Sequence, residues 1–191
     1  MKVKVVFISL FTLSLISVQG MAEVRTSVLE CRSQNNNQSA NFKVTKKYDT
    51  SKRSLTFLGT IDAIGEFEGQ RVEVHAGASF DADPNFVDPL LPYFTVENEK
   101  QETMIAIQPL NKTLDPRGDI PELPFPGYSV QAILNIKNDI GFEKIILRGI
   151  IGNYRSGDTG KALNANAGVA EGNRILAIGN YDLLCSYTVS D

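Results

Sequence analysis

The stretch YDLLCSYTV, residues 181–189, alternates between side chains that suit a protein interior and side chains that suit water. Its large apolar positions recur every second residue, which is the period of a β-strand with one buried face. Asp182 and Ser186 are expected on the opposite face. The stretch therefore predicts a half-buried strand near the end of the chain, with these inward residues: Tyr181, Leu183, Cys185, Tyr187 and Val189.

Cys185 has one potential partner in the chain, which is Cys31. The segment SVLECR, residues 27–32, alternates in the same way and places Leu29 and Cys31 on one face. An even pair of cysteines in an exported protein usually forms a disulfide. We therefore predict the bond Cys31–Cys185, between strands that are neighbours or face each other across a core. Two unrelated buried thiols are the alternative.

The same two-residue alternation runs through most of the chain, and no segment shows a sustained helical stripe. Many short strands with turn-rich joints are typical of all-β proteins. The sequence predicts an all-β fold, an antiparallel β-sandwich or barrel of eight or nine strands with two long proline-rich loops. Six further alternating segments support it: residues 41–44, 54–61, 71–79, 93–97, 103–108 and 128–136.

Two segments depart from this pattern. Residues 143–151, EKIILRGII, are almost continuously apolar, which predicts a strand covered on both faces. Residues 161–172 are rich in alanine, asparagine and glycine, and they fit either a long loop or one short helix.

The first twenty residues have the layout of a secretory signal peptide. Lys2 and Lys4 precede an apolar run of twelve residues, and small residues follow it. Twelve helical residues span roughly 18 Å, well short of the ~30 Å hydrocarbon core of a membrane. We expect residues 1–20 to be a leader, cleaved after Gly20 or Ala22, and residues 21–191 to form a single β-domain. The chain is then exported, periplasmic or extracellular, without a transmembrane span.

The charge balance argues against nucleic-acid binding. The chain contains 19 basic and 22 acidic residues, and the predicted leader holds two of the lysines and no acid. The remainder has a formal net charge of −5 and no basic block. Affinity for a phosphate backbone comes from clustered lysine and arginine, so nucleic acid is not an expected partner.

All eight prolines lie between Pro84 and Pro126, and they mark two irregular connections, residues 81–92 and 109–126. The segment between them reads as a β-hairpin with NEKQ as its loop. The two free ends of a hairpin emerge at the same end of a sheet, so both connections should lie together. We call their polar residues the candidate rim: Asp81, Asp83, Asn85, Asp88, Asp115, Arg117, Asp119 and Glu122.

Part of this candidate rim resembles the start of a calcium-binding loop. Asp81, Asp83 and Asn85 match the first ligand positions of an EF-hand, and Asp88 adds a fourth oxygen donor. Phe86 stands where that loop needs glycine, and Pro92 stands where it needs a glutamate. An irregular calcium site at these four residues is therefore the alternative to a plain solvated turn, and no other cofactor is expected.

The sequence contains no recognisable catalytic set. Its only histidine, His75, lies on the polar face of its segment and is expected at the surface. Both cysteines are assigned to each other, which leaves no thiol nucleophile. We therefore expect a non-catalytic binding or structural module whose partner is a protein, peptide, glycan, cation or small ligand. A small carboxylate-dependent hydrolase and a carrier with an apolar interior are the alternatives.

Overall fold

The computed structural model describes these residues of the chain: 23–33, 38–85, 87, 93–110, 127–137, 141–152, 157 and 159–190. Within them no helix is long and apolar enough to cross a membrane. The regular elements are ten antiparallel strands. Their bounds are β1 Val24–Ser33, β2 Ser39–Asp49, β3 Ser54–Phe67, β4 Gln70–Ala82, β5 Phe94–Glu97, β6 Met104–Pro109, β7 Gly127–Asn135, β8 Lys144–Gly152, β9 Thr159–Glu171 and β10 Arg174–Ser190.

The ten strands form one sheet in the order β4-β3-β2-β1-β10-β9-β8-β7-β6-β5. Almost every strand is hydrogen-bonded to its neighbour in the chain. The consecutive strands that are not paired are β4 and β5, which form the two edges; the first and last strands also pair with each other, in the middle of the sheet. The fold is therefore a simple meander whose two ends are joined.

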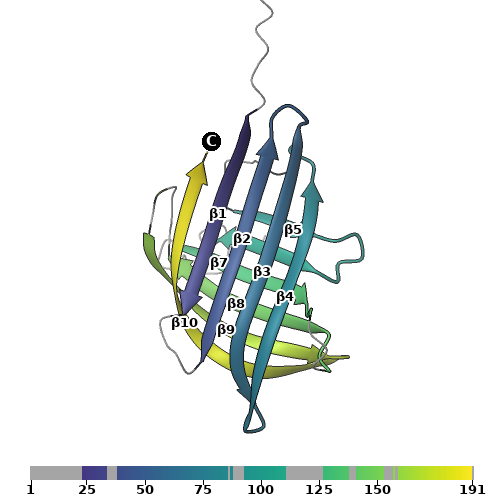
Figure 1. The fold of residues 1–191 in the computed structure, drawn as a ribbon, viewed down its shortest axis with the longest axis vertical. Helices are drawn as coiled ribbons and strands as arrows, with labels where there is room; N and C mark the ends of the chain where they lie inside the picture. Colours follow the sequence, from purple (N-terminus) through teal and green to yellow (C-terminus); the bar gives the residue numbers. More distant parts are fainter. Residues whose placement is uncertain are drawn as a thin grey trace, which may run out of the picture.

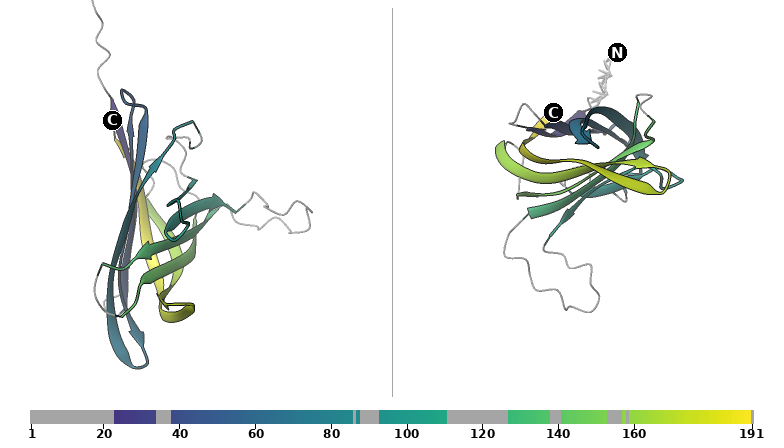
Figure 2. Two further views of the ribbon diagram at one scale, coloured as in Figure 1. Left: turned by 90° about the vertical axis from the view of Figure 1, so that its right-hand side faces the viewer. Right: turned by 90° about the horizontal axis from the view of Figure 1, so that it is seen from below.

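The sheet curls into a nearly closed barrel with two layers. Strands β1–β4 run nearly vertically in front in Figure 1, and β5–β9 cross behind them. The edge-on view in Figure 2 shows the two layers meeting at an angle. The long strand β10 curves from the back layer to the front one, and its pairing with β9 shifts register between Ala177 and Gly179. Such irregularities bend a strand and let it turn a corner between layers.

The edge strand β4 is joined to the back layer by an isolated bridge. Ala76 of β4 forms a bridge with Ile136, just after β7. Beside it, the backbone N–H of Lys137 donates to the carbonyl oxygen of His75, with an N···O distance of 2.7 Å. The barrel is therefore held shut by a contact between the front layer and the end of β7.

The predicted fold class is confirmed, with one more strand than expected. The additional strand is β9, which includes residues 161–171 of the segment that the sequence left between a loop and a helix. Alanine and asparagine have low β-propensity, which concealed the alternation of Leu163, Ala165 and Ala167 with exposed asparagines. Pairing with β8 and β10 on both sides overrides that weak local preference.

The expectation that residues 143–151 are covered on both faces is wrong. In β8 only one face is buried, and Ile145, Leu147 and Ile151 lie on it. On the opposite face Ile146 is half-buried and Ile150 is 53% exposed. The apolar run arises because isoleucines also occupy outward positions, so continuous hydrophobicity here does not indicate a second covering layer.

The interior of the barrel is filled by side chains from both layers. Phe57 of β3 and Phe94 of β5 pack with ring centroids 4.5 Å apart. A Cβ added to Gly59 of β3 would overlap the Cδ1 atom of Ile105 of β6, so only glycine leaves room for that isoleucine. The largest fully buried side chains come from six strands: Phe42, Phe57, Leu55, Ile61, Ile105, Ile107, Leu134, Ile145, Leu147, Ile151 and Leu163.

The predicted disulfide is confirmed. Cys31 of β1 lies directly opposite Cys185 of β10 in the antiparallel register, and their Cα atoms are 3.9 Å apart. Both residues are buried, at 0% and 2% exposure. The strands are therefore neighbours, which was one of the two arrangements expected. A disulfide is consistent with an oxidising, exported compartment.

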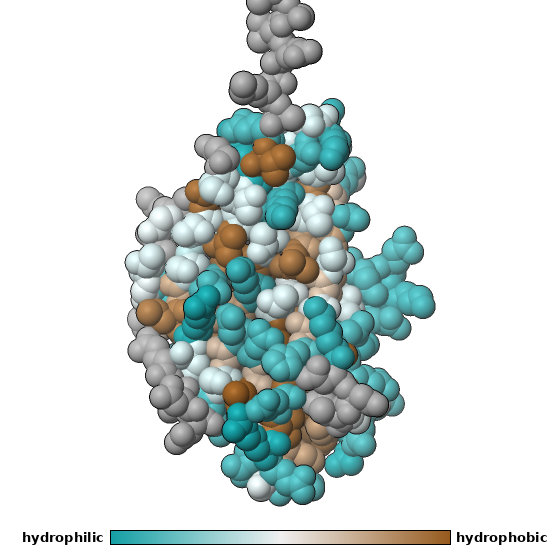
Figure 3. Space-filling view, in the orientation of Figure 1, coloured by the Kyte–Doolittle hydropathy of each residue, from teal (hydrophilic) through white to brown (hydrophobic). Residues whose placement is uncertain are grey.

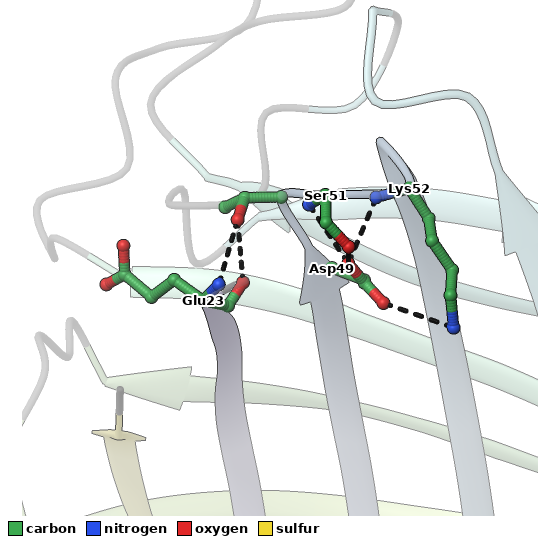
Figure 4. A network of polar contacts seen from close by, with 5 residues as sticks. Glu23, Asp49, Ser51 and Lys52 are labelled. Carbon is green, nitrogen blue, oxygen red and sulfur yellow. Dashed lines mark hydrogen bonds and ion pairs between the residues drawn. The ribbon is translucent and has the colours of Figure 1, made fainter. Parts of the chain in front are cut away.

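Short turns connect β2 to β3 and β3 to β4, and the β2–β3 turn is organised by Asp49 (Figure 4). Its Oδ1 accepts hydrogen bonds from the N–H groups of Ser51 and Lys52 and from the Ser51 hydroxyl. The Ser51 hydroxyl, followed by the Lys52 N–H, lowers the pKa of Asp49. The outer surface of this layer is mostly polar with isolated apolar side chains (Figure 3). Leu58 and Val24, each nearly half exposed, are two such outward residues of β3 and β1.

Candidate functional site

The described residues contain part of the candidate rim. Phe94 of β5 pairs with Ile107 of β6, so the chain enters and leaves this hairpin at the same end, as predicted. Five of the rim residues lie outside the described residues, and whether the two connections converge stays a prediction. These five are Asp88, Asp115, Arg117, Asp119 and Glu122.

The three described rim residues bond to the chain around them. Asp81 Oδ1 accepts a hydrogen bond from the Thr56 hydroxyl at 3.1 Å. Asp83 Oδ1 accepts from both the backbone and the side-chain nitrogen of Asn85, and Arg53 donates to Asn85 Oδ1. This is the hydrogen bonding of an aspartate-capped turn. Within the described residues no three histidine, cysteine or acidic side chains are grouped to hold a metal. Because Asp88 is not among them, the four-residue calcium site stays a prediction.

A groove of about 590 Å³ opens elsewhere, on the outer face of β6–β9. We call it the outer groove. Strand alternation sends its side chains outward: on β6, Ile105 and Ile107 are fully buried, so Ala106 between them faces out. The residues that line the outer groove are Met104, Ala106, Gln108, Ser129, Val130, Gln131, Arg148, Gly149, Ile150, Asn164 and Asn166.

The outer groove is hollow because small residues stand between long ones. Ala106 faces outward and is nevertheless only 7% exposed, so it forms part of the floor. Strand pairing places Gln131 next to Ala106, Arg148 next to Gln131 and Asn166 next to Arg148. This cross-strand row spans three strand spacings, about 14 Å in all.

A second row runs beside the first. Gln108, Ser129, Ile150 and Asn164 lie opposite one another across β6 to β9. The Gln108 side-chain nitrogen donates to Thr95 of β5 at 3.3 Å, and the Ser129 hydroxyl donates to the Gln108 backbone carbonyl. The outer groove therefore combines amide and hydroxyl groups with the apolar side chains of Met104 and Ile150.

Several polar groups of the outer groove have no protein partner in the part of the chain that the structure describes. The side chains of Gln131, Arg148, Asn164 and Asn166 form no hydrogen bond or ion pair there. Arg148 is the one charged residue among the lining residues, and none of them is acidic. The outer groove thus presents amide donors and acceptors around a single positive charge.

A smaller pocket of about 380 Å³ lies beside the disulfide, on β1, β9 and β10. Arg32 and Glu30 line it and form an ion pair with an N···O distance of 2.7 Å. The remaining lining residues include Ser33, Leu184 and Ser186. Because Arg32 is already paired with Glu30, this pocket offers a ligand fewer unpaired polar groups than the outer groove does.

His75 lies on the outer surface, as predicted, and has a partner that the sequence did not indicate. Its Nδ1 is 2.8 Å from Oδ1 of Asp62, directly across the β3–β4 pair. Both side chains are about half exposed. The two residues therefore form a surface pair between neighbouring strands, with no nucleophile assigned to it.

One polar cluster inside the barrel was missed by the sequence reading. Lys46 of β2 is only 4% exposed, and Ser27 of β1 lies directly opposite it. Burial raises the pKa of the nearby Tyr187, and Ser27 partly opposes this shift. The alternation of Phe42 and Val44, continued by two residues, would have placed Lys46 on the inner face.

Comparison with known proteins assigns no family to this chain. No protein-family model matches the sequence, and no curated protein matches it. Function must therefore be argued from the residues and the geometry described above.

Proposed function

We propose that the protein is an exported, non-catalytic binding module, periplasmic or extracellular, and that the outer groove binds a short oligosaccharide. The observation that carries this proposal is the set of unpaired amides at Gln131, Asn164 and Asn166. An amide side chain both donates and accepts hydrogen bonds, as does each hydroxyl of a sugar. A flat array of such groups therefore complements a ligand that carries hydroxyls along its length.

The position of the groove favours a saccharide over an extended peptide. A peptide that extends a sheet needs a free strand edge with unpaired backbone groups. Each of β6–β9 is paired on both sides, so no such edge lies in the outer groove. Recognition there must use side chains, and six of the eleven lining residues have polar ones.

The same observations favour binding over the two alternatives. A glycoside hydrolase of the usual kind needs two carboxyl groups about 5–10 Å apart, and the residues that line the outer groove include no acid. A carrier needs an apolar cavity of some 300 Å³ or more, whereas Ile105 packs against Gly59 across the interior.

The proposal is tested by nuclear magnetic resonance with the mature, oxidised protein and a panel of short neutral and acidic oligosaccharides. We expect at least one saccharide to shift backbone amide signals of β6–β9, and to be recovered intact. Ala106→Trp, which fills the floor, should abolish these shifts. Ser79→Trp, on the outer face of β4, is the matched control and should retain them.

Gln131→Ala keeps the test decisive if Ala106→Trp does not fold. It removes one amide without adding bulk, and it should weaken binding while leaving the melting temperature nearly unchanged. The proposal is wrong if no saccharide in the panel binds, if the shifted signals map to another surface, or if the saccharide is cleaved.

A further inference from the structure

The one charged residue that lines the outer groove is Arg148, and its guanidinium is available to bind a ligand. Arg148 stands between Gln131 and Asn166 in the first cross-strand row. The nearest acid by strand pairing is Asp182 of β10, which lies opposite Asn164 and does not line the groove. Within the described residues the guanidinium has no ion-pair partner.

The groove also lacks the feature that usually strengthens sugar binding. None of its lining residues is aromatic, so a sugar ring has no flat surface on which to stack. Hydrogen bonds between neutral groups contribute little net affinity, because they replace equally good bonds to water. A hydrogen bond to a charged group is roughly twice as strong. Arg148 is therefore the lining residue best able to give a ligand a net gain.

An arginine favours one kind of anion geometrically. Its planar guanidinium presents parallel N–H groups that match the two oxygens of a carboxylate. The amides of Gln131 and Asn166 flank this position in the same row and can bond the hydroxyls beside the carboxylate. A sugar acid offers this combination of a planar anion and adjacent hydroxyls, whereas a neutral sugar lacks the anion.

We infer that the outer groove selects oligosaccharides whose sugars carry a carboxylate, and that Arg148 binds this carboxylate while Gln131 and Asn166 bind neighbouring hydroxyls. This inference rests on the proposed function and specifies its ligand class. It assigns a specificity-determining role to Arg148 that neither motif nor sequence similarity indicates.

The test compares uronic acid oligomers with their methyl esters, which have the same sugars without the charge. The panel contains tetramers of galacturonate, of mannuronate and of alternating glucuronate and N-acetylglucosamine. Titration calorimetry should show one acidic oligomer binding about tenfold more tightly than its ester. Arg148→Gln should abolish this difference and bind both forms like the wild-type protein binds the ester.

Further arms identify the origin of the effect. Arg148→Lys keeps the charge but not the planar geometry, so it should retain only part of the preference. Arg32→Gln, at the smaller pocket, is the matched control and should leave the preference unchanged. Equal binding of acid and ester by the wild-type protein would overturn the inference and leave the proposed function standing. Equal or tighter binding of a glutamate-containing peptide, or of a sulfated oligomer, would also overturn it. Absence of binding to every saccharide would overturn both proposals.

Discussion

Tyr181 shows how one residue can couple the stability of this barrel to pH. It projects into the interior from β10 and is 3% exposed. Its hydroxyl donates a hydrogen bond to the backbone carbonyl of Ile64 on β3, with an O···O distance of 3.2 Å. Burial raises the pKa of Tyr181 from 10.0 to about 12. The hydroxyl thus ties the front layer to the curved strand β10 while it keeps its proton.

We predict that Tyr181 makes the protein less stable as the pH rises above 10. In the unfolded chain this tyrosine ionises near pH 10, whereas in the folded chain it stays protonated until about pH 12. Ionisation therefore stabilises the unfolded state relative to the folded state as the pH rises from 10 to 12, and the free energy of unfolding falls. The expected loss from this residue between pH 9 and pH 11 is about 1 kcal/mol.

Urea unfolding at pH 9, 10 and 11 measures this effect, with Tyr181→Phe for comparison. At pH 7 the free energy of unfolding of the variant should be about 1 kcal/mol lower, because the hydrogen bond from the Tyr181 hydroxyl to the Ile64 carbonyl is lost. It should also lose about 1 kcal/mol less than the wild-type protein between pH 9 and pH 11. Parallel pH profiles of the two proteins would show that Tyr181 does not carry the predicted shift.

At the scale of elements, alternation predicted most strands and failed where side chains gave conflicting signals. Residues 181–189 lie in β10 with the predicted face buried up to Tyr187, whereas Val189 is 40% exposed near the end of the chain. The strand β9 was missed because its alanines and asparagines have low β-propensity. The prediction that β8 is buried on both faces was wrong because a sequence does not distinguish outward-facing isoleucines, such as Ile150, from buried ones.

The candidate site was harder to predict than the strands. The candidate rim could be predicted from prolines and acids in two short segments. Predicting the outer groove would have required the register of four strands, β6 to β9. Register is set by long-range pairing, so no short segment contains it. Arg148 was therefore not among the candidates from the sequence, and only strand pairing places it between Gln131 and Asn166.

The packing of Gly59 on β3 against Ile105 on β6 predicts that substitutions at these two positions are energetically coupled. Gly59→Ala should destabilise the protein by about 1–3 kcal/mol, because the new methyl group meets Ile105 Cδ1. Ile105→Val removes that carbon atom at a cost of about 1 kcal/mol. The double variant should be more stable than the sum of the two losses implies, by about 1 kcal/mol.

Urea unfolding of the two single variants and the double variant measures this coupling. Gly152→Ala is the matched control, because a Cβ there would meet only Lys161 Cδ at 3.6 Å, an ordinary contact. It should change the stability little. Strict additivity of Gly59→Ala and Ile105→Val would show that the two layers are not in contact at this point.

At the scale of the whole molecule, the disulfide joins segments that are 154 positions apart. Without the disulfide the unfolded chain can adopt more conformations, which lowers its free energy. The simple loop-closure model puts this effect at roughly 5 kcal/mol, and measured effects are smaller. We predict that replacing both cysteines with alanine lowers the free energy of unfolding by about 2–5 kcal/mol. The buried core should still let the variant fold.

Chemical denaturation, together with far-ultraviolet circular dichroism, checks this prediction. The folded spectra of the variant and the oxidised protein should match, whereas the midpoint of unfolding should fall. An unchanged midpoint would mean that pairing between β1 and β10 alone holds the ends together. A single replacement, Cys31→Ala, is a less useful comparison because it leaves a thiol at Cys185.

The pairing of β1 with β10 also sets the order of events for a chain that becomes available for folding from its N-terminal end onward. Strands β1 to β4 can associate as they emerge, since each meets its successor directly. Cys31, by contrast, lies in the first strand and its partner Cys185 in the last, so its thiol has no disulfide partner until nearly all of the polypeptide is available. Pairing of β1 with β10 and oxidation of the two sulfur atoms thus become one late event, so a chain that stops short of β10 would keep an unpaired edge at β1 and a reactive thiol at Cys31.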